Sequence, residues 1–180
     1  MFNYYDLKEK AAQRNLNESF EILLRNTKHK LKDKDEFDIF LSHSFSDKAV
    51  VLQLISELEA YGYTVYVDWI VDPDLDRSYV NESTANKLRQ RMKQCKSLLY
   101  ATTENASNSK WMPWELGYKD GNNGKAAILP IKKDQDFDGQ EYLGIYPIID
   151  NDNDTYLWIN DNGRKEFAQW IGYTYTKPKH

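Results

Sequence analysis

The sequence predicts an α/β domain built on a mostly parallel β-sheet with helices on both faces. Short apolar runs, typical of buried strands, alternate along the chain with longer segments whose apolar residues recur at helical spacing. Parallel strands need crossover connections, and right-handed crossovers place helices on both faces of a sheet. At 180 residues, the chain is long enough for one such domain with a substantial core.

The N-terminal residues 1–35 are expected to form a helical extension ahead of this domain. They are strongly charged, and the apolar residues between Leu16 and Leu24 have the spacing of one helix face. A polar stretch, LKDKDE, separates them from the first strongly apolar run. We therefore place the domain itself over residues 36–180.

The first half of the domain is expected to be strand, helix, strand. FDIFLS (37–42) is a nearly continuous apolar run, as in a buried parallel strand. A helix over 46–62 follows, with Ser46 as a candidate N-cap and Gly62 at its C-terminal end. YTVYVDW (63–69) is rich in β-branched and aromatic residues and predicts the second strand.

The second half repeats this alternation after a loop of mixed charge that contains Pro73. SLLYATT and KAAILPI are apolar runs of strand length, and STANKLRQRMKQCK has the composition of a helix. The remaining expected elements are a helix over 83–96, strands over 97–103, 125–131 and 142–149, a helix beginning near 109, and a C-terminal helix within 160–173.

Ligands of open α/β sheets bind beyond the carboxyl ends of the strands. Three loops begin there in this sequence: SHSFSD after the first strand, DWIVDPDLDR after the second, and ENASNSKWMPWE after the third. If the first strand is central, the three loops share one edge of the sheet. They are therefore the places to look for chemistry.

Glu115 lies among tryptophans near the start of the helix that follows the third of these loops. Asn108 or Ser109 can cap that helix, and Pro113 is tolerated near its first turn. A carboxylate beside aromatic walls can stabilise the ribosyl cation that develops when an N-glycosidic bond breaks. An acid that merely complements the helix dipole is the alternative, and position alone leaves both readings open.

The loop after the first strand offers Ser42, His43, Ser44 and Phe45 as candidate substrate-binding residues. Short hydroxyls and backbone N–H groups at a helix start can hold a phosphate. The alternative is that Ser44 or Ser46 caps the following helix. A lone histidine in a loop is more often structural than catalytic, and His43 has no partner at the spacing of a catalytic or metal site.

Asp68, Trp69 and Trp111 complete the set of candidate substrate-binding residues. Trp69 follows the second strand, where its ring can stack on a base or pyridinium ring or cap the end of the sheet. Trp111 lies one helical turn before Glu115 and offers a second ring. Among the arginines, Arg77 is placed to meet a diphosphate, whereas Arg89 and Arg91 are expected on a solvated helix face.

Composition excludes several classes of protein. A net charge of −4 gives no sign of a nucleic-acid partner, and no apolar run approaches the roughly 20 residues that cross a membrane. The single cysteine fits a reducing cytoplasm, and the first residues lack the apolar core of a signal peptide. Three histidines and one cysteine argue against a structural zinc site. The sequence lacks the GxGxxG motif of Rossmann dinucleotide sites, the GxxxxGK[ST] motif of P-loops and the GxSxG motif of α/β-hydrolases.

Three segments together resemble the TIR (Toll/interleukin-1 receptor) domain family of the bacterial type. FDIFLSHSFSDK resembles the opening box of that family, GYTVYVDW its second strand, and SKWMPWELGY the helix that carries its glutamate. The resemblance spans about Phe37 to Ile149. It implies a flavodoxin-like fold with five strands in the order 2-1-3-4-5, and it places the loop from Asp72 to Arg77 where the family has its BB loop.

The resemblance also implies a function, namely cleavage of NAD at the nicotinamide–ribose bond with Glu115 as the catalytic residue. NAD is then a substrate, and no separate cofactor is implied. The chain is similar to the TIR component of Thoeris-type antiphage systems, whose product is a signalling nucleotide that activates a separate effector. A non-catalytic module acting through TIR–TIR contacts is the alternative, and an enzyme resembling nucleoside deoxyribosyltransferases is a weaker one.

Overall fold

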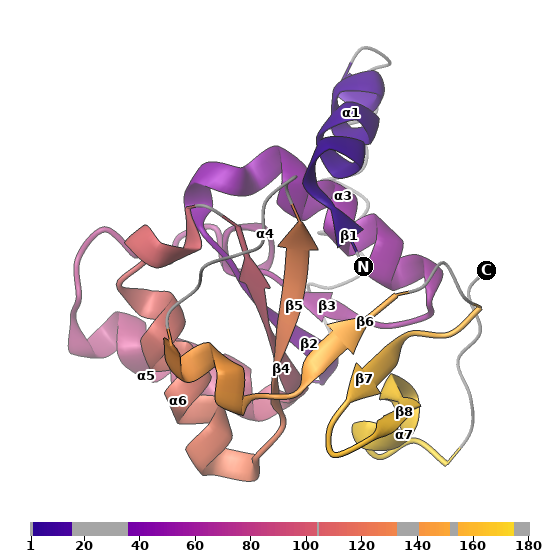
Figure 1. The fold of residues 1–180 in the computed structure, drawn as a ribbon. Helices are drawn as coiled ribbons and strands as arrows, with labels where there is room; N and C mark the ends of the chain where they lie inside the picture. The colour runs from indigo at the N-terminus through magenta and orange to yellow at the C-terminus, as the bar shows by residue number, and fades with distance from the viewer. Residues whose placement is uncertain (1, 16–35, 104, 133–140, 152–154, 175–180) are drawn as a thin grey trace.

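A computed structural model describes residues 2–15, 36–103, 105–132, 141–151 and 155–174, and the fold is mixed α/β (Figure 1). The helices are α1 (Tyr4–Asn15), α3 (Lys48–Ala60), α4 (Asp68–Val71), α5 (Glu82–Gln94), α6 (Trp111–Asn123) and α7 (Phe167–Trp170). The strands are β1 (Phe2–Asn3), β2 (Phe37–Ser42), β3 (Val65–Tyr66), β4 (Cys95–Thr102), β5 (Ala126–Lys132), β6 (Ile148–Asp150), β7 (Trp158–Asn160) and β8 (Arg164–Glu166). Three short 3₁₀ turns are η1 (Phe45–Asp47), η2 (Ala106–Asn108) and η3 (Glu141–Ile145).

The sheet has the expected parallel centre. Strands β3, β2, β4, β5 and β6 are adjacent in that order and all parallel, which is the predicted order 2-1-3-4-5 with β2 as the first of the five. The sheet is larger than predicted, because β7 and β8 extend it as antiparallel strands and β1 pairs with the last residues of β5.

Both faces of the sheet are covered, as predicted. In β2, Ile39 and Leu41 pack in the core beneath α1, α3 and α7, while Phe40 packs in the core beneath α5 and α6. Figure 1 shows α5 and α6 side by side along one flank of the sheet, with α1 and α3 together on the other. Because alternate side chains of a strand point to opposite faces, a central strand buried on both faces must be almost wholly apolar, as β2 is.

Three expected elements are wrong in part. The expected strand 63–69 pairs only over β3, because the chain turns into the helical α4 at Asp68. The expected strand 142–149 begins as the turn η3 and pairs only from Ile148. The expected helix within 160–173 is instead the β7–β8 hairpin followed by the short α7. The hairpin reverses through Asp161, Asn162 and Gly163, of which the last two have positive φ, the usual geometry of Asn-Gly turns.

The N-terminal residues join the domain closely. Strand β1 continues the sheet beside β5, and Leu7 of α1 is buried in the same core as α3. Residues 16–35, the rest of the expected helical extension, lie outside the described residues. The division into residues 1–35 and 36–180 therefore stays a prediction.

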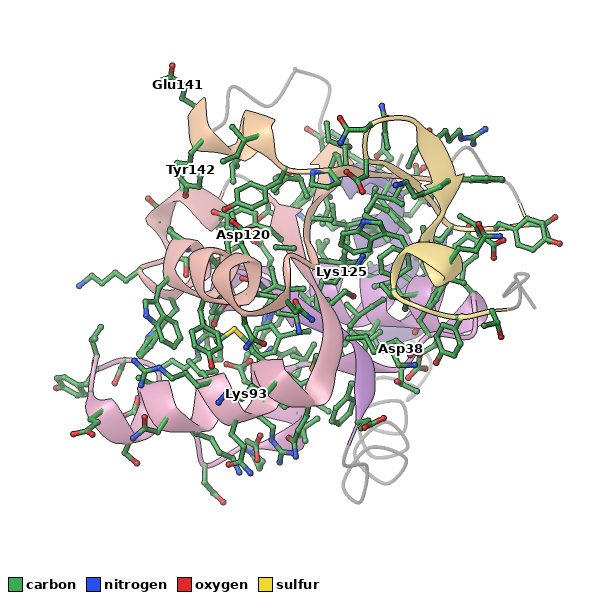
Figure 2. The ribbon with its side chains drawn as sticks, turned by 90° about the horizontal axis from the view of Figure 1, so that it is seen from below. Asp38, Lys93, Asp120, Lys125, Glu141 and Tyr142 are labelled. Atoms are coloured by element: carbon green, nitrogen blue, oxygen red, sulfur yellow. The ribbon has the colours of Figure 1, made fainter. Side chains whose placement is uncertain are left out.

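The amino-terminal end of the sheet is closed by a polar network around Asp38. This carboxylate accepts hydrogen bonds from Tyr173 Oη at 2.6 Å, Lys96 Nζ at 3.2 Å and the Thr64 backbone N–H at 3.0 Å. Figure 2 looks onto this end, where Asp38 and Lys125 mark the starts of β2 and β5. None of the described helices is long and apolar enough to cross a membrane.

Candidate active site

A cavity of about 590 Å³ lies at the carboxyl edge of the sheet, where the loops after β2, β3 and β4 meet. Its volume falls within the range of pockets that hold small molecules. All three loops singled out from the sequence contribute to its wall. The lining residues are His43, Ser44, Phe45, Ser46, Asp68, Trp69, Pro73, Leu75, Asp76, Arg77, Ser78, Val80, Asn108, Ser109, Lys110 and Trp111.

Glu115 lies directly behind this wall. It is the fifth residue of α6, its side chain is 0% exposed, and its carboxylate accepts hydrogen bonds from Ser42 Oγ and Arg77 Nη2, both at 2.5 Å. It is therefore beyond the first turn of the helix, where an acid would complement the dipole. A hydroxyl and a guanidinium therefore fix this carboxylate in place behind Arg77, which lines the cavity.

Arg77 connects Glu115 with a second buried carboxylate. Its Nη1 donates to Asp68 Oδ2 at 2.7 Å, so that one guanidinium bridges the two acids. Burial by itself raises the pKa of the Asp68 carboxyl, but the charge and hydrogen bond of Arg77 hold that pKa below its usual range. The other carboxylate oxygen, Asp68 Oδ1, is buried and has no hydrogen-bond partner among the described residues.

His43 is held in one neutral form by its neighbours. Its Nδ1 lies 2.8 Å from the Leu41 carbonyl, and its Nε2 lies 2.8 Å from Trp69 Nε1. A carbonyl can only accept and an indole N–H can only donate, so the ring proton is on Nδ1 and Nε2 accepts. Asp68 Oδ1, at 3.9 Å from Nε2, is too far for a hydrogen bond. His43 thus orients Trp69 at the cavity wall.

The serines of the first loop do not cap α3, which corrects that expectation. The N-cap residue is Asp47, and its side chain makes no capping hydrogen bond. The Asp47 carboxylate instead accepts from Thr103 Oγ1 at 2.5 Å and from Asn105 Nδ2 at 2.7 Å. This pair of bonds ties the loop after β2 to the loop after β4. Ser44 is buried at the cavity wall, next to the exposed ring of Phe45.

The two candidate tryptophans hold different positions. Trp69 is half-buried on α4 and keeps part of its ring at the cavity, where Lys48 Nζ lies 5.2 Å from the ring centroid. Trp111 is buried, and its Nε1 donates to the Arg77 carbonyl at 3.0 Å. Trp111 therefore fixes the backbone of the loop that carries Arg77, a role that its position in the sequence did not indicate.

The loop from Asp72 to Val80 is anchored at its start. The Asp72 carboxylate accepts from Arg91 Nε at 2.7 Å, from Arg91 Nη2 at 2.8 Å and from Tyr66 Oη at 2.8 Å. The expectation of a solvated Arg91 is wrong, because 14% of its side chain is exposed and it forms this bidentate pair. From the sequence, Arg77 was expected only as a residue that meets a diphosphate. Its pairing with two acids from other elements has no signal in the local sequence.

Comparisons with known proteins place the chain among related sequences. The family model described as "TIR domain" matches residues 39–171. A protein of Bacillus cereus (strain MSX-D12), named "Probable 3' cyclic ADP-D-ribose synthase ThsB'", is 43% identical in an alignment 180 positions long that covers 94% of this chain and 93% of that protein. A protein of Cytobacillus dafuensis, provisionally named cyclic ADP-D-ribose synthase TIR2, is 32% identical over 99 residues, 54% of this chain and 26% of that protein. Among solved structures, the TIR domain of the Toll-related receptor TRR-2 from the lower metazoan Hydra magnipapillata matches with a TM-score of 0.47 and 11% identity, over 62% of this chain and 83% of that chain.

Proposed function

The chain belongs to the TIR domain family, and from this premise we propose that it is an enzyme that cleaves NAD at the nicotinamide–ribose bond and closes the remaining ADP-ribose into a cyclic nucleotide. The observation that carries the proposal is the buried, hydrogen-bonded carboxylate of Glu115, which lies directly behind Arg77 of the cavity wall. The name of the Bacillus cereus relative, with which this chain aligns over nearly its full length, supports the cyclic product.

Glu115 acts on the charge that develops at the ribose. As the bond between C1 of the ribose and the ring nitrogen breaks, its electron pair goes to nicotinamide, which leaves as a neutral molecule. The ribose carbon becomes cationic, and a fixed carboxylate in a site with little water stabilises that charge more than it stabilises the ground state. The hydrogen bond from Ser42 holds the carboxylate in place during this step.

The second half of the reaction decides the product. A hydroxyl of the same ADP-ribose attacks the cationic carbon, forms the new C–O bond and loses its proton, so that NAD gives cyclic ADP-ribose, nicotinamide and one proton. Capture by water would give free ADP-ribose instead. The walls formed by Trp69, Phe45 and the loop that carries Arg77 enclose the nucleotide and favour the internal hydroxyl over water.

We further propose, as the wider setting, that the product is a messenger in antiviral defence. A cyclic nucleotide released in the cytoplasm would activate a separate effector protein, and TIR–TIR self-assembly would control its production. Ser42, His43, Ser44, Phe45, Asp68, Trp69 and Trp111 are proposed as the substrate-binding residues around Glu115. This part of the proposal is supported by the family and by the position of these residues at or next to the cavity.

The test is to incubate the protein with NAD and to resolve the products by chromatography and mass spectrometry. Wild-type protein is compared with Glu115→Gln and with a matched control, Glu141→Gln, dilute and concentrated, with and without extract of phage-infected cells. Figure 2 shows Glu141 projecting from η3 away from the body of the protein. We expect nicotinamide and a product with the mass of a cyclic ADP-ribose from wild type and from the control, and neither from Glu115→Gln.

Three results would contradict the proposal. Undiminished turnover by Glu115→Gln would remove Glu115 from the catalytic role. No nicotinamide under every condition would instead favour the non-catalytic module that acts through TIR–TIR contacts. Release of a free base from deoxynucleosides would point to a deoxyribosyltransferase.

A further inference from the structure

We propose that Arg77 is a latch: in the structure described here its guanidinium covers Glu115, and its side chain must swing away before a ribose can reach the catalytic carboxylate. This inference rests on the proposed role of Glu115 and adds a conformational step to it.

The first observation is that Glu115 is closed off from the cavity. The cavity is lined by Arg77, whereas the Glu115 side chain behind it is 0% exposed. Both carboxylate oxygens already accept a hydrogen bond, Oε1 from Arg77 and Oε2 from Ser42. A ribosyl cation needs direct contact with this carboxylate, and in the observed arrangement the guanidinium occupies the side that faces the cavity.

The second observation is that the Arg77 guanidinium pairs with two acids, and that both acids come from elements other than the loop that carries Arg77. Asp68 comes from α4 and Glu115 from α6, and together they raise the pKa of Arg77, although burial by itself would lower it. One planar guanidinium matches two carboxylates with its separate N–H groups, which a lysine ammonium does not do in the same way. The arrangement is a specific closed state.

The third observation identifies the side chain, and not the loop, as the moving part. The backbone around Arg77 is fixed on both sides: the Asp76 carbonyl accepts from Thr84 Oγ1 at 2.8 Å, and the Arg77 carbonyl accepts from Trp111 Nε1 at 3.0 Å. The start of the loop is held by Asp72. A rotation about the side-chain bonds of Arg77 into the cavity uncovers Glu115 and leaves all these anchors intact.

A latch reduces the apparent affinity for any ligand whose ribose must reach Glu115, because only the open fraction of the protein can bind it. Nicotinamide riboside is a suitable probe, since it carries the ribose and the pyridinium ring but no phosphate with which Arg77 could pair. Its affinity is measured by calorimetry for wild type, Arg77→Ala, Arg77→Lys and the matched control Arg164→Ala, which changes an arginine on β8 outside the cavity lining.

We expect Arg77→Ala to bind nicotinamide riboside at least about tenfold more tightly than wild type, and Arg164→Ala to bind like wild type. Arg77→Lys keeps the charge between the acids but cannot bridge them as a fork, so an intermediate affinity is expected. This variant keeps the test valid if Arg77→Ala fails to fold, which circular dichroism reveals. Nicotinamide riboside is a cation, so loss of the Arg77 charge by itself tightens binding in Arg77→Ala, and the gain in Arg77→Lys, which keeps the charge, is the result that tests the latch.

An affinity for nicotinamide riboside that is unchanged or weaker in the folded Arg77 variants, including no measurable binding by any protein, would overturn the latch. NAD turnover by wild type, measured as described above, tests the proposed function separately. The affinity measurement can therefore contradict the latch while NAD turnover still supports the proposed function. Absence of turnover under every condition would contradict the proposed function itself.

Discussion

Ser42 and Glu115 lie 73 positions apart in the chain, and a hydrogen bond of 2.5 Å joins their side chains at the carboxyl edge of the sheet. Ser42 is the last residue of β2, and Glu115 is in the second turn of α6. The end of the central strand thus fixes the proposed catalytic carboxylate directly. Both side chains are fully buried, so the bond is shielded from competing water.

Removal of this hydroxyl tests its importance. We expect Ser42→Ala to lower the turnover of NAD about 10- to 100-fold, since a hydrogen bond to a charged group contributes about 1.5–3 kcal/mol. Steady-state kinetics measure the turnover, and urea unfolding checks that the variant is folded. Ser97→Ala is the matched control, because Ser97 is equally buried but donates to the Asp38 carbonyl at the opposite end of the sheet. Equal turnover in the two variants would argue against a catalytic effect of Ser42.

The Trp69 side chain offers two separable functions, its ring at the cavity and its N–H group on His43. Trp69→Phe keeps an aromatic face and removes the hydrogen bond, whereas Trp69→Ala removes both. If the ring stacks on the nucleotide, KM rises by about 2- to 30-fold in Trp69→Ala, as expected for a contact of about 0.5–2 kcal/mol, and much less in Trp69→Phe. Similar KM values for both variants would assign the effect to the bond with His43.

The Asp68–Arg77 pair makes stability depend on pH in the acid range. The pKa of Asp68 is lower in the folded protein than in the unfolded chain, so its contribution is fully present above about pH 4 and is lost as the pH falls through the folded-state value. We expect Asp68→Asn to be less stable than wild type at pH 7, with the difference shrinking toward low pH. Urea unfolding across pH 2–7 measures it. The exposed Asp74→Asn is the control, and a gap that stays constant with pH would contradict the assignment.

The anchor at Asp72 supports the loop that carries Arg77. Asp72→Ala removes the acceptor of three hydrogen bonds from Arg91 and Tyr66 and leaves the mostly buried Arg91 guanidinium without its acid partner. We expect a loss of about 2–4 kcal/mol in the free energy of unfolding, together with a higher KM for NAD because the cavity wall loosens. Thermal unfolding and kinetics check both effects. A loss no larger than that of Asp74→Ala, in the same loop, would show that the anchor is dispensable.

The sequence predicted much of the architecture because the relevant signals are local. Each central strand is a short apolar run and each main helix has its own apolar face. The order of the elements and the parallel centre of the sheet could therefore be predicted from the sequence. The three-residue strands β7 and β8 are too short to show a period of two, and their Asp-Asn-Gly turn was the only local sign of a hairpin. The two-residue β1 is shorter still.

The sequence by itself determined that this chain forms an α/β domain of the TIR type, with Glu115 near the edge where its loops gather. Only the tertiary structure decided what Glu115 contacts. Asp68, Arg77 and Glu115 come from three different elements, and a charged side chain is paired by whichever partner the packed elements bring within about 3 Å of it. Apolar burial depends on patterns that a sequence displays, whereas the pairing of buried charges depends on distances that exist only after the sheet and its helices have packed.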